Sequence, residues 1–275
     1  MRWDRDYDSP NVEDRRAEGG AGLGGGGGVP LWGLLAIAGR FGWKGVVIAL
    51  IVVGFLSYSG SNLCSGSGTY DRAVDPRSVA TERADSDLTH FVGFVLDDVN
   101  RTWSDQLPGY EDARLVLFRN AIRSACGTAT TAVGPFYCPL DRKVYIDLAF
   151  YDELRRRFGA PGDFAQAYVI AHEVGHHVQN LRGRLGRGEV SSVPIELQAD
   201  CLAGAWGRSA DARGLVEVGD VDEALHAAAQ IGDDTIQRKA TGHVQPETFT
   251  HGTAAQRSGS FRRGYQGGAA ACDIR

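Results

Sequence analysis

The chain contains the segment Ala171-His172-Glu173-Val174-Gly175-His176-His177, which has the pattern H-E-x-x-H. Four-residue spacing places His172 and His176 one turn apart on one helix face, so both imidazoles can reach one metal ion. Glu173 is the next residue around the helix and can reach a water on that ion without binding the ion itself. The pattern predicts a zinc site with two histidine ligands and Glu173 as general base.

The surrounding sequence predicts the helix that this motif requires. Helical spacing of apolar residues begins after Gly162-Asp163 and continues to about Arg182. His177 lies about 100° around that helix from its neighbour His176. We therefore expect His177 on the helix surface or beside a ligand, and not on the ion.

A third ligand has to come from elsewhere, because a catalytic zinc site uses three protein ligands and a water. Glu196 and Asp200 lie at the start of the next predicted helix, again one turn apart. One carboxylate can bind the metal while the other accepts the Nδ1–H of a ligand histidine. The spacing alone does not distinguish these two roles.

Other patterns indicate a mixed domain from about residue 81 onward. Residues 134–150 carry the strongest strand signal, centred on Val144, Tyr145 and Ile146. Helical patterns are predicted to begin near Asp85 or Ser86, Pro194, Asp220 and Thr253, and to run over residues 111–125. We predict an α+β fold for residues 81–275.

Composition is that of a globular protein, with 275 residues of which 43% are hydrophobic and 23% charged. This argues against wholesale disorder and against a multi-span membrane protein. The net charge of −5 argues against a nucleic-acid partner. The glycine-rich residues 1–28 are predicted to be a disordered tail.

The apolar stretch 29–59 is interrupted only by Arg40 and Lys44. Its charge-free part, Gly45 to Tyr58, is shorter than the roughly 20 residues of a membrane span, but it reaches that range if Lys44 snorkels to the headgroups. We predict a single membrane anchor over 29–59 and a linker over 60–80. The alternatives are a buried core helix and a cleaved signal peptide, although the region before the stretch is long for a signal.

Lysine and arginine are more frequent before the apolar stretch than after it. The positive-inside rule then predicts a single-pass protein of the cell membrane, with a cytoplasmic N-terminus and an extracytoplasmic domain. Cys126 and Cys138 flank a turn region rich in glycine and threonine, which favours a disulfide-stapled hairpin in an exported domain. Cys64 is left as a free or intermolecular thiol.

Several segments resemble the bacterial putative neutral zinc metallopeptidase family. They are Met1-Arg2-Trp3, Asn11 to Arg16, Gly134 to Cys138, Val144 to Asp147, Phe164 to His177, Glu196 to Cys201 and Thr250 to Thr253. Members of this family also carry a glycine-rich stretch and one membrane span after the start. The E-x-x-A-D string further resembles the gluzincin peptidases of the membrane CAAX-protease and heat-shock type.

The resemblance implies a zincin-like metallopeptidase domain, mostly helical with a small sheet, after one N-terminal transmembrane helix. It implies one zinc ion per chain, with Glu196 as third ligand and Asp200 behind a ligand histidine. Similar proteins also suggest a disulfide between Cys201 and Cys272. His251 is a second catalytic candidate that would stabilise the oxyanion, and its alternative role is a helix-cap or core histidine.

These expectations predict a membrane-anchored peptidase that acts on a peptide or protein substrate. The alternatives are a non-catalytic zinc-binding scaffold and another zinc hydrolase, such as an amidase. The intact Glu173 argues against the scaffold, because a structural zinc site needs no base. An extended peptide is expected to add to the strand that contains Tyr145 and Ile146. The sequence identifies no protein partner.

Overall fold

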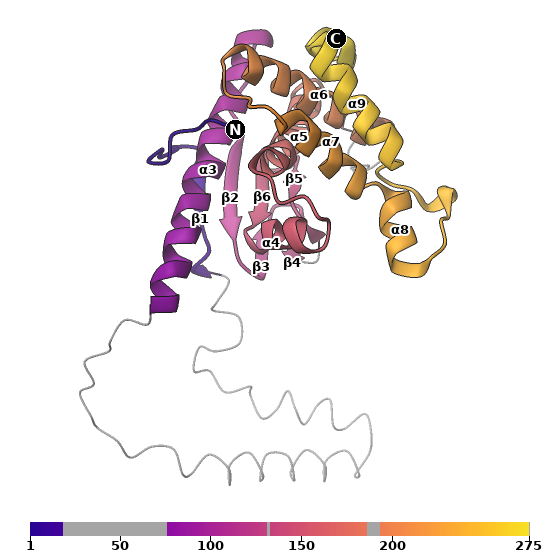
Figure 1. The fold of residues 1–275 in the computed structure, drawn as a ribbon. Coiled ribbons are helices and arrows are strands. Elements are labelled where there is room, and N and C mark those ends of the chain that lie inside the picture. Colours follow the sequence, from indigo (N-terminus) through magenta and orange to yellow (C-terminus); the bar gives the residue numbers. More distant parts are fainter. Residues whose placement is uncertain (19–75, 131–132, 186–192, 275) are drawn as a thin grey trace, which may run out of the picture. The chain divides into compact units, whose positions relative to one another are not determined.

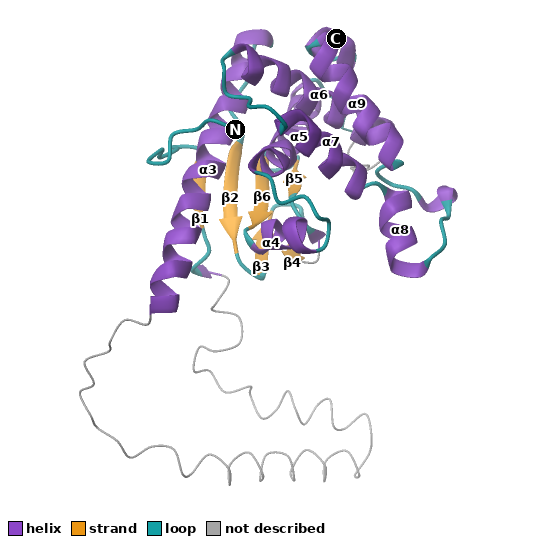
Figure 2. Ribbon diagram, viewed as in Figure 1, coloured by secondary structure: helices purple, strands orange, loops and turns teal. Residues whose placement is uncertain are grey.

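The computed structural model describes residues 1–18, 76–130, 133–185 and 193–274 (Figure 1). The helices are α3 (Pro76–Gln106), α4 (Ala149–Arg156), α5 (Asp163–Leu181), α6 (Val193–Ala212), α7 (Asp220–Gln230), α8 (Asp233–Thr241) and α9 (Ala254–Gly267), with the short 3-10 helices η5 (Pro246–Thr248) and η6 (Ala269–Cys272). The strands are β1 (Val12–Asp14), β2 (Arg114–Phe118), β3 (Ala121–Ser124), β4 (Gly127–Thr130), β5 (Phe136–Cys138) and β6 (Lys143–Asp147). Figure 2 shows this mixture of helices and small sheets, which confirms the predicted α+β class.

The main sheet has four strands in the order β1-β2-β6-β5. β1, β2 and β6 are mutually parallel, whereas β5 is antiparallel to β6 and forms one edge. The strand signal over 134–150 is thus confirmed as the β5–β6 pair. β3 and β4 form a separate antiparallel hairpin.

β2 occupies the region where we predicted a helix over residues 111–125, and that prediction is wrong. Leu115 and Leu117 belong to the main core with α3, α5 and α6, whereas Val116 and Phe118 face a smaller core under the β3–β4 hairpin. A strand buried on both faces shows a continuous apolar run instead of alternation. Such a run does not by itself distinguish a strand from a helix.

The other predicted helices are present as α3, α5, α6, α7 and α9. Thr253 and Gln256 form the reciprocal hydrogen bonds of a capping box at the start of α9. α3 begins at Pro76, however, which lies before the predicted cap and inside the predicted linker over 60–80. Proline is tolerated in the first turn of a helix, so it does not prevent this earlier start.

The first eighteen residues belong to the folded domain, so the predicted disordered tail over 1–28 is wrong for residues 1–18. β1 pairs with β2, and Met1 is only 7% exposed. The Trp3 ring packs edge-on against Phe91 of α3, with ring centroids 5.2 Å apart. The tail was predicted from the composition of residues 1–28, which is dominated by the glycine run that begins at Gly19. That run lies outside the described residues.

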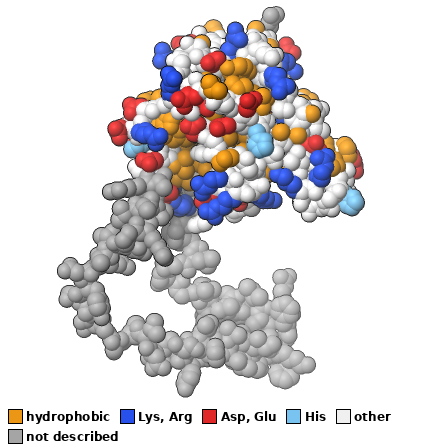
Figure 3. Space-filling view, viewed as in Figure 1, with side chains coloured by type: hydrophobic (Ala, Val, Ile, Leu, Met, Phe, Trp, Pro, Cys, Tyr) orange, Lys and Arg blue, Asp and Glu red, His pale blue; other side chains and the backbone are white. Residues whose placement is uncertain are grey.

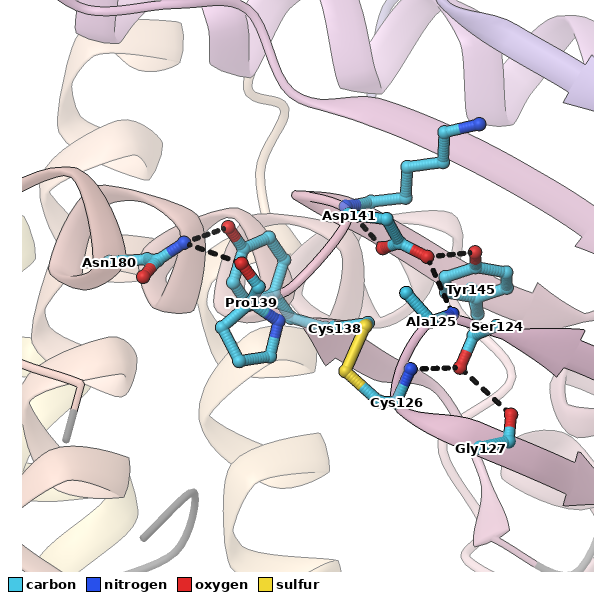
Figure 4. Close-up of a disulfide and its surroundings, with 11 residues drawn as sticks. Ser124, Ala125, Cys126, Gly127, Cys138, Pro139, Asp141, Tyr145 and Asn180 are labelled. Carbon is cyan, nitrogen blue, oxygen red and sulfur yellow. Dashed lines mark hydrogen bonds between the residues drawn. A yellow bond between two sulfur atoms is a disulfide. The ribbon is translucent and has the colours of Figure 1, made fainter. Parts of the chain in front are cut away.

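Two disulfides brace the domain, and both are the predicted pairs. Cys126–Cys138 ties the turn between β3 and β4 to the end of β5 (Figure 4). Beside it, Asp141 accepts hydrogen bonds from the Tyr145 hydroxyl and the Ala125 amide. Cys201–Cys272 joins α6 to η6 near the C-terminal end of the described chain.

Among the described residues, no helix has the length and apolar character needed to cross a membrane. The predicted anchor over 29–59 and Cys64 lie outside the described residues. On the face shown in Figure 3, acidic and basic side chains of the described residues are interspersed.

The docking of the N-terminal segment can be tested through the ion pair between Glu13 of β1 and Lys143 of β6, whose atoms are 2.8 Å apart. Both side chains are about two-thirds buried, so Glu13→Lys should lower the free energy of unfolding by about 1 kcal/mol or more. In a domain of this size that corresponds to a fall in Tm of at least about 2 °C. The double variant Glu13→Lys/Lys143→Glu should recover most of the loss, and the exposed Glu247→Lys provides the control. Equal Tm values for Glu13→Lys and the control would contradict the docking.

Candidate active site

The H-E-x-x-H motif lies in the middle of α5, and most of this helix is buried. His172 and His176 point to the same side, with ring centroids 4.8 Å apart. Glu196 comes from the first turn of α6, which packs against α5. One ligand atom from each of these three residues lies within 4.8 Å of the others. The structure therefore brings the predicted ligand set together in one place.

The two carboxylate oxygens of Glu196 approach the Nε2 atoms of the two histidines. Oε2 lies 3.2 Å from Nε2 of His172, and Oε1 lies 3.5 Å from Nε2 of His176. Two imidazole nitrogens and a carboxylate form one of the donor sets of catalytic zinc. The residues present thus fit the predicted metal, and their separations leave room for one ion among them.

The opposite nitrogen of each ring is held by an acceptor. Nδ1–H of His172 donates to Oδ1 of Asp200 over 2.8 Å, and Nδ1–H of His176 donates to Oε1 of Gln179, also over 2.8 Å. Both contacts favour the tautomer in which Nε2 is available to a metal. This geometry favours the roles implied by the resemblance, with Glu196 on the metal side and Asp200 behind His172.

Asp200 is a fully buried carboxylate that joins three helices. Besides His172 of α5, it accepts a short hydrogen bond of 2.5 Å from the Tyr168 hydroxyl. Arg257 of α9 donates to both of its oxygens, over 2.9 and 3.0 Å. Burial raises the pKa of Asp200, but Arg257 and His172 more than offset this and hold the pKa well below its usual range. Asp200 is therefore a permanent anion at the back of the site.

The same carboxylates control the charge of His172. Burial by itself lowers the pKa of this imidazole, but Asp200 and Glu196 outweigh burial and raise the pKa to about 10. Glu196 has a pKa below its usual range, because both histidines oppose the effect of its burial. Without a metal, the proton on His172 balances this negative charge. A cation bound by the same atoms would replace that proton.

Close helix contacts made possible by glycine place these side chains. A Cβ atom on Gly175, inside the motif, would lie only 3.1 Å from the backbone of Ala199, so glycine allows α6 to approach α5. α6 and α9 touch through Gly204 and Gly264, where a Cβ atom would lie 2.0 and 1.8 Å from backbone oxygens. This close contact between α6 and α9 brings Arg257 to Asp200.

A cavity of about 350 Å³ opens onto the predicted metal site. Glu173 and His251 both line it, as do the three ligand residues. Nδ1 of His251 faces Asp233 and Thr250, and almost half of its side chain is exposed. His251 therefore reaches the same cavity as Glu173 from a loop before α9.

His177 is buried and lies away from the ligand cluster. Its Nε2–H donates to the carbonyl oxygen of Glu111, and its Nδ1 accepts from the Tyr137 hydroxyl of β5. Asn180 donates to the same hydroxyl. Burial lowers the pKa of His177, in keeping with a neutral ring. Our expectation of a surface position is thus wrong. The His177 side chain instead links α5 to the edge strand β5 through its hydrogen bond with Tyr137.

Sequence reasoning missed Gln179, Tyr168 and Arg257. Gln179 follows His176 by three residues, so helical spacing could have indicated it as a partner of that ring. Tyr168 lies one turn before His172, and the same rule applies. Arg257 is far away in the sequence, and no local pattern indicates it.

We predict that the chain binds one zinc ion and that His172→Ala, His176→Ala and Glu196→Ala abolish stoichiometric binding. Asp200→Asn keeps the three ligands but removes the orienting anion, so zinc affinity should fall by about 10–100-fold. Metal analysis and competition titration with a chromophoric chelator measure both effects. The control is His243→Ala, an exposed histidine outside the cluster. A larger loss for Asp200→Asn than for Glu196→Ala would reverse the two assignments.

Comparison with known proteins agrees with the site. The family model described as "Putative neutral zinc metallopeptidase" matches residues 1–274. "Uncharacterized protein YpfJ" of Escherichia coli (strain K12) is 42% identical over 286 residues, which cover 98% of this chain and 96% of the relative. "Uncharacterized protein Rv2575" of Mycobacterium tuberculosis (strain ATCC 25618 / H37Rv) is 45% identical over 190 residues, which cover 62% of this chain and 65% of the relative. No solved structure matches. The chain belongs to the putative neutral zinc metallopeptidase family.

Proposed function

We propose that this protein is a zinc-dependent peptidase that hydrolyses peptide bonds with Glu173 as general base. One observation carries the proposal. His172, His176 and Glu196 each place one ligand atom within 4.8 Å of the others. All three residues line a cavity, and Glu173 lines the same cavity. A site of this kind provides three protein ligands, an open side for substrate and a carboxylate that is not itself part of the ligand cluster.

When bound, a zinc ion lowers the pKa of a water molecule towards about 7 and polarises the scissile carbonyl. The Glu173 carboxylate takes a proton from the attacking water and passes it to the leaving amine nitrogen. His172 and His176 are held in orientation by Asp200 and Gln179, so neither imidazole has to reorient during the reaction. His251 donates a hydrogen bond to the developing oxyanion from the cavity wall.

The wall of the cavity supports a peptide as the substrate. Gly134 to Tyr137, which lead into and form edge strand β5, line the same cavity as the metal cluster. β6, which contains Tyr145 and Ile146, is paired with β2 on one side and β5 on the other, so the expectation that a peptide adds to this strand is wrong. β5 pairs with β6 on one side only within the described sheet. An extended peptide that adds to its other side would run past Glu173, with backbone hydrogen bonds setting its position. This arrangement also supports a zincin-like fold, which is part of the proposal.

Apolar side chains form much of the remaining wall. They are Phe150, Phe158, Val169, Ile231 and Ile236. Such a wall favours substrates with an apolar residue next to the scissile bond, because burial of that residue contributes binding free energy.

The two alternatives are less well supported. A scaffold would need only a closed metal site, whereas this ligand cluster opens to a cavity that contains Glu173. An amidase would use the same ligands and base, but the edge strand beside the site favours the peptidase, because it offers backbone groups to an extended peptide. Membrane attachment through residues 29–59 remains a prediction.

Glu173→Gln should keep zinc but lose hydrolysis, because it removes the base and leaves all ligands in place. The expected fall in kcat/KM is about 10²–10⁴-fold. Cleavage of a peptide library by the zinc-loaded full-length protein, followed by mass spectrometry, measures it beside the zinc content. Glu247→Gln, an exposed glutamate, is the matched control. Wild-type activity in Glu173→Gln would exclude this mechanism.

The role of His251 can be separated from that of Glu173. Loss of one oxyanion donor lowers kcat by about 10²–10³-fold, so His251→Ala should reduce kcat with little change in KM or zinc content. His243→Ala controls for loss of an exposed histidine elsewhere. An unchanged kcat in His251→Ala would leave His251 as a loop residue without a catalytic role.

A further inference from the structure

The N-terminal segment, residues 1–18, and the domain after residue 76 form one folded unit. β1 aligns with β2 in a parallel ladder, with Val12 opposite Leu115 and Asp14 opposite Leu117. The backbone amide of Leu115 donates to Asn11 over 2.9 Å, and that of Arg15 donates to Leu117 over 2.8 Å. These bonds make β1 a member of the main sheet.

Side chains along the whole segment add to this ladder. The Glu13 carboxylate receives Lys143 Nζ at 2.8 and 2.9 Å. Tyr7 and Asn11 both donate to Asp97 of α3, over 3.0 and 2.8 Å. A Cβ atom on Gly93 of α3 would lie only 2.8 Å from Cβ of Ser9. Glycine at this position therefore allows the N-terminal segment to pack closely against α3.

The chain leaves and re-enters this unit at neighbouring points. Arg16 lies two residues before the end of the N-terminal segment, and its guanidinium Nη1 lies 3.7 Å from the Asp85 carboxylate of α3. The same nitrogen donates to the backbone carbonyl of Asp85 over 3.5 Å. A contact of this kind cannot form across the roughly 30 Å of a bilayer's hydrocarbon core.

We infer that the N-terminal segment and the peptidase domain lie on the same side of the membrane. The predicted topology, with residues 1–18 in the cytoplasm and residues 81–275 outside it, would instead place β1 and β2 in different compartments. A chain that crossed a membrane once between residues 18 and 76 could not form the β1–β2 pairing.

This inference brings two sequence arguments into opposition. The lysine and arginine bias assigns the N-terminal segment to the cytoplasm, whereas the disulfides Cys126–Cys138 and Cys201–Cys272 are typical of an oxidising compartment. The two arguments are compatible only if a membrane separates residues 1–18 from the domain that contains the disulfides. The inference depends on strand pairing and ion pairs, and not on the zinc chemistry, so it stands or falls separately from the proposed function.

Cysteine labelling of the full-length protein in spheroplasts tests the inference. Asp8→Cys marks the N-terminal segment at a side chain that is 92% exposed, and Val218→Cys marks the domain at a fully exposed position. Each is made in a Cys64→Ser background. A membrane-impermeant maleimide that adds mass is applied to intact and to permeabilised spheroplasts. The Cys64→Ser protein without an added cysteine measures how much label the remaining native cysteines take up.

We expect Asp8→Cys and Val218→Cys to give the same result in intact spheroplasts, and both to react after permeabilisation. Labelling of both places the protein outside the cytoplasm, and protection of both places it inside; either outcome supports the inference. Labelling of one and protection of the other overturns it. An unchanged Tm in each variant shows that the added cysteine has not unfolded the domain.

Discussion

The Asp200 carboxylate is the interaction on which the site depends. It is fully buried, and an unpaired charge in that position would be strongly unfavourable. Arg257 balances the charge through two hydrogen bonds, one to each oxygen, while Tyr168 and His172 both donate to Oδ1. Three helices are fixed relative to one another by this one group, because its partners come from α5 and α9 while it lies on α6. Loss of Arg257 would remove the hydrogen bond to Oδ2 and leave the buried charge of Asp200 without its countercharge.

The parts of the site that were predictable are those with short sequence spacing. His172, Glu173 and His176 lie within five residues, so helix geometry alone determines their relative positions. Glu196 and Asp200 share the same spacing, but only the packing of α6 on α5 separates their roles. Arg257 lies 57 residues after Asp200, and the glycine contact between α6 and α9 brings them together. No periodicity in the sequence encodes such a contact.

The fold was predictable to a similar extent. α5, α6, α7 and α9 follow from periodicity and start signals, and α9 has the capping box that Thr253 and Gln256 suggested. β2 was missed because burial on both faces removes the alternation by which strands are recognised. β1 was missed because its three residues acquire their structure only from the pairing with β2, and the composition of the neighbouring glycine run concealed them.

The pairing of β1 with β2 also sets an order on folding during synthesis. Val12 meets Leu115 only after about a hundred further residues have been made, and the amino group of Met1 contacts Asp163 and Asp220, which are 162 and 219 residues away. Contacts of such high sequence separation form late, because the chain must first close a long loop. Residues 1–18 are synthesised before their partners and are therefore among the last parts of this unit to fold. Until it docks, β2 remains an open sheet edge in a nascent chain that also carries the apolar stretch 29–59, and this interval is when the chain is most exposed to aggregation.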